Sequence, residues 1–221
     1  MPLYETKRGL AAGYGNGATP SARLTTLGDQ VTCDFFTAMI LDGRGYQVRA
    51  GTIATGLAAQ DVIADTVAEM CADAATGTTI IPVSFHIGLR GVATTTTLQV
   101  AVKGVGAVST AGTAFTPLPL RQGGSASVSS ARVQASTVTV TAELDTTTRR
   151  LFEYEDVQTQ TPTTVGGNTA LGSIAASTQA LRYVGVGPAC VYVQVASTTA
   201  QTLYFATLDY IEGPTLLFVP S

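Results

Sequence analysis

The segment Thr78–Arg90, TTIIPVSFHIGLR, constrains the fold of this chain more than any other stretch. Successive side chains of a strand point to opposite faces, so apolar residues at every second position predict a strand with one apolar face. The apolar residues with this spacing are Ile81, Val83, Phe85, Ile87 and Leu89. Because proline cannot donate a ladder hydrogen bond, we expect the strand to be an edge, or to be bulged, at Pro82.

The same period of two recurs along the chain, between loops rich in Gly, Pro and Thr. The further strands that it predicts are Tyr46–Thr55 with a bulge near Gly51, Thr97–Val105, Thr137–Leu144, Arg149–Val157, Ala180–Val186, Ala189–Ala196, Gln201–Ile211 and Leu216–Val219. Pro117 and Pro119 indicate an extended connection or an edge strand, and the apolar segment Thr32–Leu41 ends at the turn signal Asp42-Gly43. Short strands that alternate with loops predict an all-β sandwich or barrel.

The segment Asp61–Ala75 is compatible with two structures. Its apolar residues fit a helical stripe, but a helix would stack four carboxylates at i, i+4 spacing, where like charges repel. Those carboxylates are Asp61, Asp65, Glu69 and Asp73. The other possibility is a pair of short strands, Val62–Ala64 and Val67–Ala72.

The composition argues against some classes of partner. Charged residues are 12% of the chain, about half the usual share, so we expect much of the surface to meet other subunits. A net charge of −3 argues against direct nucleic-acid binding, which needs a basic patch. No apolar run approaches the length of a membrane-spanning helix, and the N-terminus lacks the apolar core of a signal peptide.

The domain prediction is a flexible N-terminal arm at residues 1–30, followed by a single β-sandwich domain at residues 31–221. The glycines of Gly13-Tyr14-Gly15-Asn16-Gly17 disfavour regular structure. A phosphate-binding loop would need a strand before them and a helix after them, and the sequence shows neither.

The residues that could support catalysis do not form a convincing set. His86 is the only histidine, and Ser84 would lie on the same strand face but about 6.5–7 Å away. We therefore predict a structural or interface histidine. The three cysteines, Cys33, Cys71 and Cys190, have no CxxC spacing, so we interpret them as small core residues in a reduced protein.

Two groups of carboxylates are candidate sites. Asp61, Asp65, Glu69 and Asp73 could share one face, either as a solvated acidic face or as an ion site at a subunit interface. Glu153, Glu155 and Asp156 could supply the acid and base of a glycosidase, although the chain has no Trp for a sugar platform. Pairing of these charges with Arg149 and Arg150 is the simpler interpretation. The sequence thus predicts no enzyme activity, no cofactor and no metal site.

Several segments resemble, in the same order, virion structural proteins of bacteriophages of jelly-roll type, many known only from environmental sequence. They are YQVRAGTIAT at Tyr46–Thr55, DTVAEMCADAATGTTIIPVSFHI at Asp65–Ile87, GTAFTPLPLR at Gly112–Arg121 and LYFATLDYIEGP at Leu203–Pro214. The resemblance covers most of residues 20–215. It implies an antiparallel two-sheet jelly-roll-like sandwich, with Thr78–Leu89 as a core strand and Val67–Ala72 as a strand hairpinned to it.

The function that the resemblance implies is structural. We expect a protein of the virion, assembled in the host cytoplasm, that forms homotrimers and builds or decorates a phage capsid. Its partners would be itself and other capsid proteins, with no direct nucleic acid and no membrane. The alternative is a receptor- or glycan-binding head of a tail or fibre. That alternative predicts an exposed aromatic cluster, drawn from Tyr183, Tyr192, Tyr204 and Tyr210.

Overall fold

The computed structural model describes residues 35–52, 54–60, 63–91, 96–141, 148–158, 173–177, 181–197 and 203–218. The predicted arm at residues 1–30 lies outside this part of the chain. The elements are α1 (Phe35–Leu41), β1 (Gly45–Ala50), β2 (Leu57–Ala58), β3 (Val67–Ala74), β4 (Thr78–Gly91), β5 (Thr96–Val105), β6 (Thr110–Phe115), β7 (Leu118–Pro119), β8 (Ser130–Thr139), β9 (Arg149–Gln158), β10 (Ser173–Ser177), β11 (Gly185–Val186), β12 (Ala189–Ser197), β13 (Leu203–Pro214) and α2 (Thr215–Phe218).

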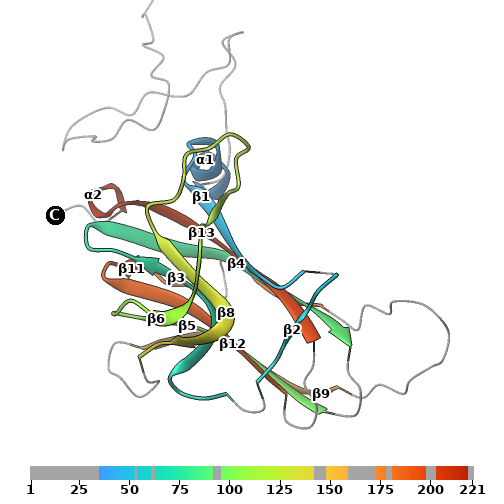
Figure 1. The fold of residues 1–221 in the computed structure, drawn as a ribbon. Coiled ribbons are helices and arrows are strands. Elements are labelled where there is room, and N and C mark those ends of the chain that lie inside the picture. Colours follow the sequence, from blue (N-terminus) through green and yellow to red (C-terminus); the bar gives the residue numbers. More distant parts are fainter. Residues whose placement is uncertain are drawn as a thin grey trace, which may run out of the picture.

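The strands form two antiparallel sheets that pack face to face (Figure 1). Sheet 1 has the order β10-β4-β13-β1-β7, with β11 also pairing β4 and β2 also pairing β13. Sheet 2 has the order β6-β8-β3-β12-β5-β9. The predicted all-β sandwich is therefore confirmed, and the predicted edge role of the Pro117–Pro119 stretch is confirmed by β7 at the border of sheet 1.

The connectivity is that of a jelly roll. Eight of the strands form nested antiparallel pairs, in which β1 pairs β13, β3 pairs β12, β4 pairs β10 and β5 pairs β9. Nested pairs of this kind arise when one long antiparallel ribbon folds over on itself, so that alternate pairs enter opposite sheets. The strands β6 and β8 extend sheet 2 beyond β3.

Side chains from both sheets fill the space between them. Alternate residues of the central strands are fully buried there, including Val48 of β1, Val193 of β12 and Leu208 of β13. All nine residues of β12 are buried, because the opposite face of this strand is covered as well. That face belongs to a second apolar cluster, which we call the outer cluster: Ala68, Cys71, Val105, Val138, Val140, Cys190 and Tyr192.

The strand β4 lies inside sheet 1, and the prediction that it is an edge, or is bulged, at Pro82 is confirmed by a bulge. Its pairing with β13 shifts register between Asp209 and Tyr210, so that Val83 is an extra residue beside Pro82. On its other side β4 pairs with β10 as far as Ser84 and with β11 from Ile80. Pro82, which has no N–H to donate, thus lies between these two short partner strands.

This bulge changes which residues of β4 face the core. Phe85, Ile87 and Leu89 are buried in the core as predicted. Beyond the bulge the core residue is Ile80, while Ile81 and Val83 are only half-buried. The predicted five-residue apolar stripe is therefore wrong in its first part. One inserted residue shifts the alternation, so the side chains on the N-terminal side of the bulge change faces.

The segment after residue 66 is a strand, as the resemblance implied, but its predicted partner is wrong. β3 pairs β8 and β12 in sheet 2, whereas β4 lies in sheet 1. The turn between them, where Thr78 N–H donates to the Ala75 carbonyl, passes from one sheet to the other. Residues 63 and 64 of the predicted strand Val62–Ala64 are not in a strand, and Val62 lies outside the described residues.

Two further predictions need correction. The strand β1 ends at Ala50, and Gly51 (φ +67°) begins a turn and not a bulge. A side chain there would be strained, and its Cβ would lie 2.9 Å from the Tyr204 carbonyl oxygen. The predicted strand Leu216–Val219 is instead the short helix α2, because Thr215 N–H donates to the Gly77 carbonyl and the chain leaves the sheet there.

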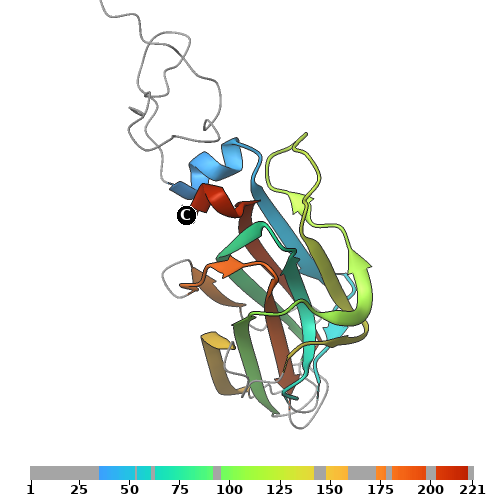
Figure 2. The same ribbon diagram turned by 90° about the vertical axis from the view of Figure 1, so that its left-hand side faces the viewer.

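The two helices lie together at one end of the sandwich (Figures 1 and 2), and α2 is the last described element of the chain. The rings of Phe35 and Phe218 meet edge to face, with centroids 6.5 Å apart. α1 ends as the turn signal predicted: Gly43 has φ +78°, and its N–H donates to the Ile40 carbonyl. Among the described residues, no helix is long and apolar enough to cross a lipid bilayer.

Candidate functional site

His86 does not take part in a catalytic triad in the described structure. It lies on β4 opposite Thr207, and its ring contacts Phe205 with centroids 6.3 Å apart. The hydroxyl of Ser84 donates to Asp209 Oδ2 at 2.7 Å and not to the imidazole. The predicted structural histidine is compatible with this arrangement, in which the serine and the acid bind each other.

The four spaced carboxylates do not share a face. Asp61 lies outside the described residues, and Asp65 is exposed. Glu69 and Asp73 are both buried, but they point to opposite sides of sheet 2. The pairing of β3 with β8 shifts register between Ala68 and Met70, so the regular alternation that i, i+4 residues would share is interrupted at Glu69.

Glu69 faces the interior, between the sheets. The hydroxyl of Tyr204, on β13, donates to its Oε2 at 2.9 Å, while Oε1 has no partner of good geometry among the described residues. Burial raises the pKa of Glu69 to about 7, although hydrogen bonding to Tyr204 and Gln60 opposes part of the rise. The same burial, and the nearby Glu69, raise the pKa of Tyr204 well above its usual value.

A groove of about 410 Å³ runs over the outer face of β5 and β9. The two glutamates considered for glycoside hydrolysis line it, together with Arg150 and the buried Lys103. Glu153 lies 3.4 Å from Arg150 Nε, and Glu155 accepts a hydrogen bond from Gln99 at 3.2 Å. The side chain of Asp156 is not described. The predicted ion pairing is confirmed for Arg150 and Glu153, and each glutamate has a structural partner.

Glu212 is a buried carboxylate that sequence reasoning missed. It accepts hydrogen bonds from Ser127 Oγ at 2.7 Å, Val128 N at 2.7 Å and Ser129 N at 3.0 Å. These contacts attach the segment before β8 to β13, across the end of the sandwich. No local pattern could reveal them, since the partners are more than 80 residues apart in the chain.

We expect Glu212→Ala to lower the free energy of unfolding by about 2–3 kcal/mol, because it leaves buried N–H groups without an acceptor. Glu212→Gln keeps one acceptor oxygen and should cost less. Urea denaturation followed by circular dichroism measures both, and equal stability of Glu212→Ala and wild type would contradict the assigned role.

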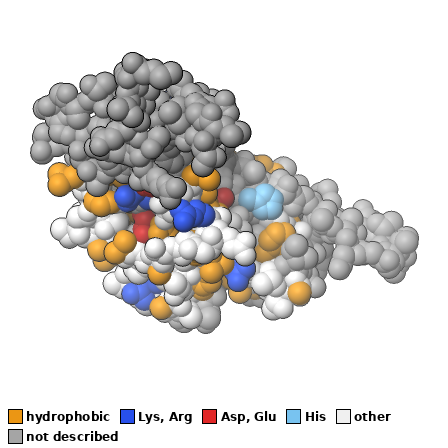
Figure 3. Space-filling view, turned by 90° about the horizontal axis from the view of Figure 1, so that it is seen from above, with side chains coloured by type: hydrophobic (Ala, Val, Ile, Leu, Met, Phe, Trp, Pro, Cys, Tyr) orange, Lys and Arg blue, Asp and Glu red, His pale blue; other side chains and the backbone are white. Residues whose placement is uncertain are grey.

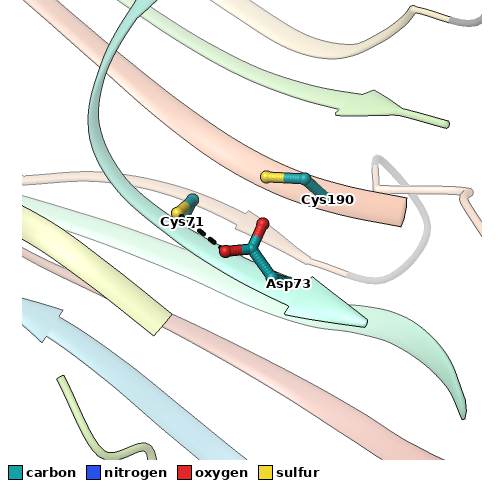
Figure 4. Close-up of side chains that lie close together, drawn as sticks. All are labelled: Cys71, Asp73 and Cys190. Atoms are coloured by element: carbon teal, nitrogen blue, oxygen red, sulfur yellow. Dashed lines mark hydrogen bonds between the residues drawn. The ribbon is translucent and has the colours of Figure 1, made fainter. Parts of the chain in front are cut away.

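The cysteines Cys71 and Cys190 are buried and free, as predicted, and Cys33 lies outside the described residues. The structure adds a neighbour that was not predicted: both lie beside Asp73, as Figure 4 shows. Burial raises the pKa of the Cys190 thiol well above its usual value, and the nearby Cys71 and Asp73 raise it further. The spacing Cys71-Ala72-Asp73 could have indicated that two of them share a strand face, but Cys190 is brought in by strand pairing alone.

Comparisons of the chain with protein-family models, with curated proteins and with solved structures found no match.

Proposed function

We propose that this protein is a structural virion protein that forms homotrimers and builds or decorates a bacteriophage capsid. The observation that carries the proposal is the jelly-roll connectivity of a chain with few charges. Jelly rolls serve as viral capsid domains, lectin domains and cupins. The sequence resemblance to phage virion proteins favours the first of these uses.

The surface supports self-association. Several large apolar side chains are exposed, most strongly Val128 at 77% and Leu216 at 76%. Figure 3 shows the end that carries α1 and α2, where the described surface is mostly white and orange with a few blue and red side chains. Many weak contacts of such surfaces add together when each subunit touches several neighbours.

The other uses of the fold have less support. A cupin-like metal centre needs clustered histidines, and this chain has one histidine. The aromatic platform proposed for a receptor- or glycan-binding head is contradicted for three of its four residues. Tyr192, Tyr204 and Tyr210 are fully buried, and the rest of the set, Tyr183, is half-buried against the core.

The test is the assembly state of the purified full-length protein, measured by light scattering on a sizing column, native mass spectrometry and electron microscopy. We expect trimers or larger regular particles, and a monodisperse monomer at all concentrations would contradict the proposal. In a purified particle, hundreds of copies would indicate a shell or decoration protein, whereas a few copies would indicate a tail component.

Charge substitutions locate the contacts. Leu216→Lys and Val128→Lys place a cation on the two most exposed large apolar side chains described, and we expect at least one of them to weaken association. Gln122→Lys, at an exposed polar position, is the matched control and should assemble as wild type does. If all three variants assembled equally well, neither apolar position would belong to an interface.

A further inference from the structure

Three side chains that can bind a metal converge on the outer face of sheet 2. Cys71 and Asp73 are two residues apart on β3, and Cys190 on β12 is the direct cross-strand partner of Asp73. The two sulfurs and a carboxylate oxygen all lie within 4.8 Å of one another. In Figure 4 the side chains from the two strands point into the same small space.

The spacing is close to that of ligands on one cation. Donor atoms about 2.3 Å (sulfur) and 2.0 Å (oxygen) from a tetrahedral zinc ion lie about 3.5 Å from each other. The distance from Cys71 Sγ to Asp73 Oδ2 is 3.8 Å. Small side-chain rotations would therefore bring the three atoms to bonding distance without moving the strands.

The surroundings hold the carboxylate in place. Ser109, in the loop after β5, donates its N–H to Oδ1 at 2.8 Å and its hydroxyl to Oδ2 at 2.6 Å. With the hydrogen bond from Cys71 Sγ to Oδ2 at 3.8 Å, three of the four lone-pair positions of the carboxylate are in use. Ionisation of the Cys71 thiol removes that third bond, so the carboxylate can still bind a cation. Hydrogen bonds of this kind orient metal ligands in proteins. The Ser109 hydroxyl also lies 3.0 Å from Cys71 Sγ, where it could occupy a fourth ligand position.

The charges of such a site would balance. Two thiolates and one carboxylate carry three negative charges. A divalent cation and Arg132, whose Nε lies 4.0 Å from Asp73 Oδ2, carry three positive charges. The rest of the outer cluster is apolar and buried, which keeps competing water away. A pair of sulfurs selects zinc and similar thiophilic ions over magnesium or calcium.

We propose that Cys71, Asp73 and Cys190 bind one zinc-like divalent cation, with Ser109 Oγ or a water molecule as the fourth ligand. The ion would connect β3, β12 and the loop after β5, and so stabilise sheet 2. This role is structural, and it is independent of whether the protein belongs to a virion.

The first test is metal content. The full-length protein carries the substitution Cys33→Ser, which removes the thiol outside the cluster. It is purified without added metal, and its metal content is measured by elemental mass spectrometry before and after reconstitution with zinc. We expect about one zinc per chain after reconstitution. Removal with a strong chelator should lower the apparent Tm by about 10 °C. Cobalt added to the chelated protein should give the intense near-ultraviolet absorption of thiolate-bound cobalt.

Variants separate binding from folding. Cys190→Ala and Asp73→Asn should each lose the bound metal and the thiolate absorption. The control variant Glu153→Gln leaves Cys71 and Cys190 in place and should bind the metal as the wild type does. If the variants do not fold, the chelator and cobalt measurements on the parent protein still decide. Reconstituted protein that takes up neither zinc nor cobalt would overturn the proposal, as would a Cys71–Cys190 disulfide in protein alkylated at lysis.

Discussion

Replacing Phe85 by alanine is expected to lower the free energy of unfolding by about 3–5 kcal/mol. Phe85 is 1% exposed in the middle of β4, and its ring lies 6.3 Å from that of Phe152 on β9 in the opposite sheet. Truncation removes the transfer free energy of the ring and leaves a cavity where the two sheets meet. Denaturant unfolding of the purified variant measures the loss, and a change below about 1 kcal/mol would contradict this packing.

Two further variants act as controls for Phe85→Ala. Phe85→Leu keeps an apolar side chain in the same place and should cost clearly less, because the remaining cavity is smaller. Val186→Ala removes an apolar side chain from a position that is 45% exposed in β11, and it should change stability by less than about 0.5 kcal/mol. Equal losses in all three variants would indicate a general effect of truncation and not a cavity.

The stability of the protein is expected to fall as pH rises, because of Glu69. Its pKa is about 7 in the folded protein against a usual value of 4.5, so between these values the folded state binds more protons than the unfolded state. The stabilisation from protonated Glu69 is therefore complete below pH 4.5 and is lost as pH rises through 7. The loss is about 3 kcal/mol.

The comparison of wild type with Glu69→Gln isolates this contribution. Glutamine keeps an acceptor for the Tyr204 hydroxyl but cannot titrate, so the variant should lack this part of the pH dependence. Urea denaturation of both proteins at a series of pH values gives the difference in free energy of unfolding. A difference that stays constant from pH 4.5 to above 7 would show that Glu69 does not titrate in this range.

The positions of most strands could be predicted from the sequence, because alternation is a local property of the extended backbone. The segments Thr97–Val105, Ala189–Ala196 and Gln201–Ile211 correspond closely to β5, β12 and β13. One failure lies where a single residue alters the pattern. A bulge is expected at Pro82, but the alternation by itself does not show that Ile81 and Val83 then leave the core face.

Little of the candidate site could be predicted. The i, i+4 spacing of Glu69 and Asp73 suggested a shared face, yet the register shift after Ala68 sends one carboxylate to Tyr204 and the other to Ser109. Register shifts depend on the partner strand, and the sequence of β3 alone does not specify it. The same holds for the helix α2, whose residues Thr215–Phe218 were predicted to form a strand.

By itself the sequence determined the class of the fold, since a period of two in apolar residues can bury only one face of an extended chain and so requires sheets packed together. It also determined a surface with few charges. Only the tertiary structure decided which strands pair, and thereby the jelly-roll connectivity, the burial of Glu69 and Glu212, and the meeting of Cys71, Asp73 and Cys190. The physical reason is that side-chain alternation arises within one strand, whereas these contacts join residues that are far apart in the chain.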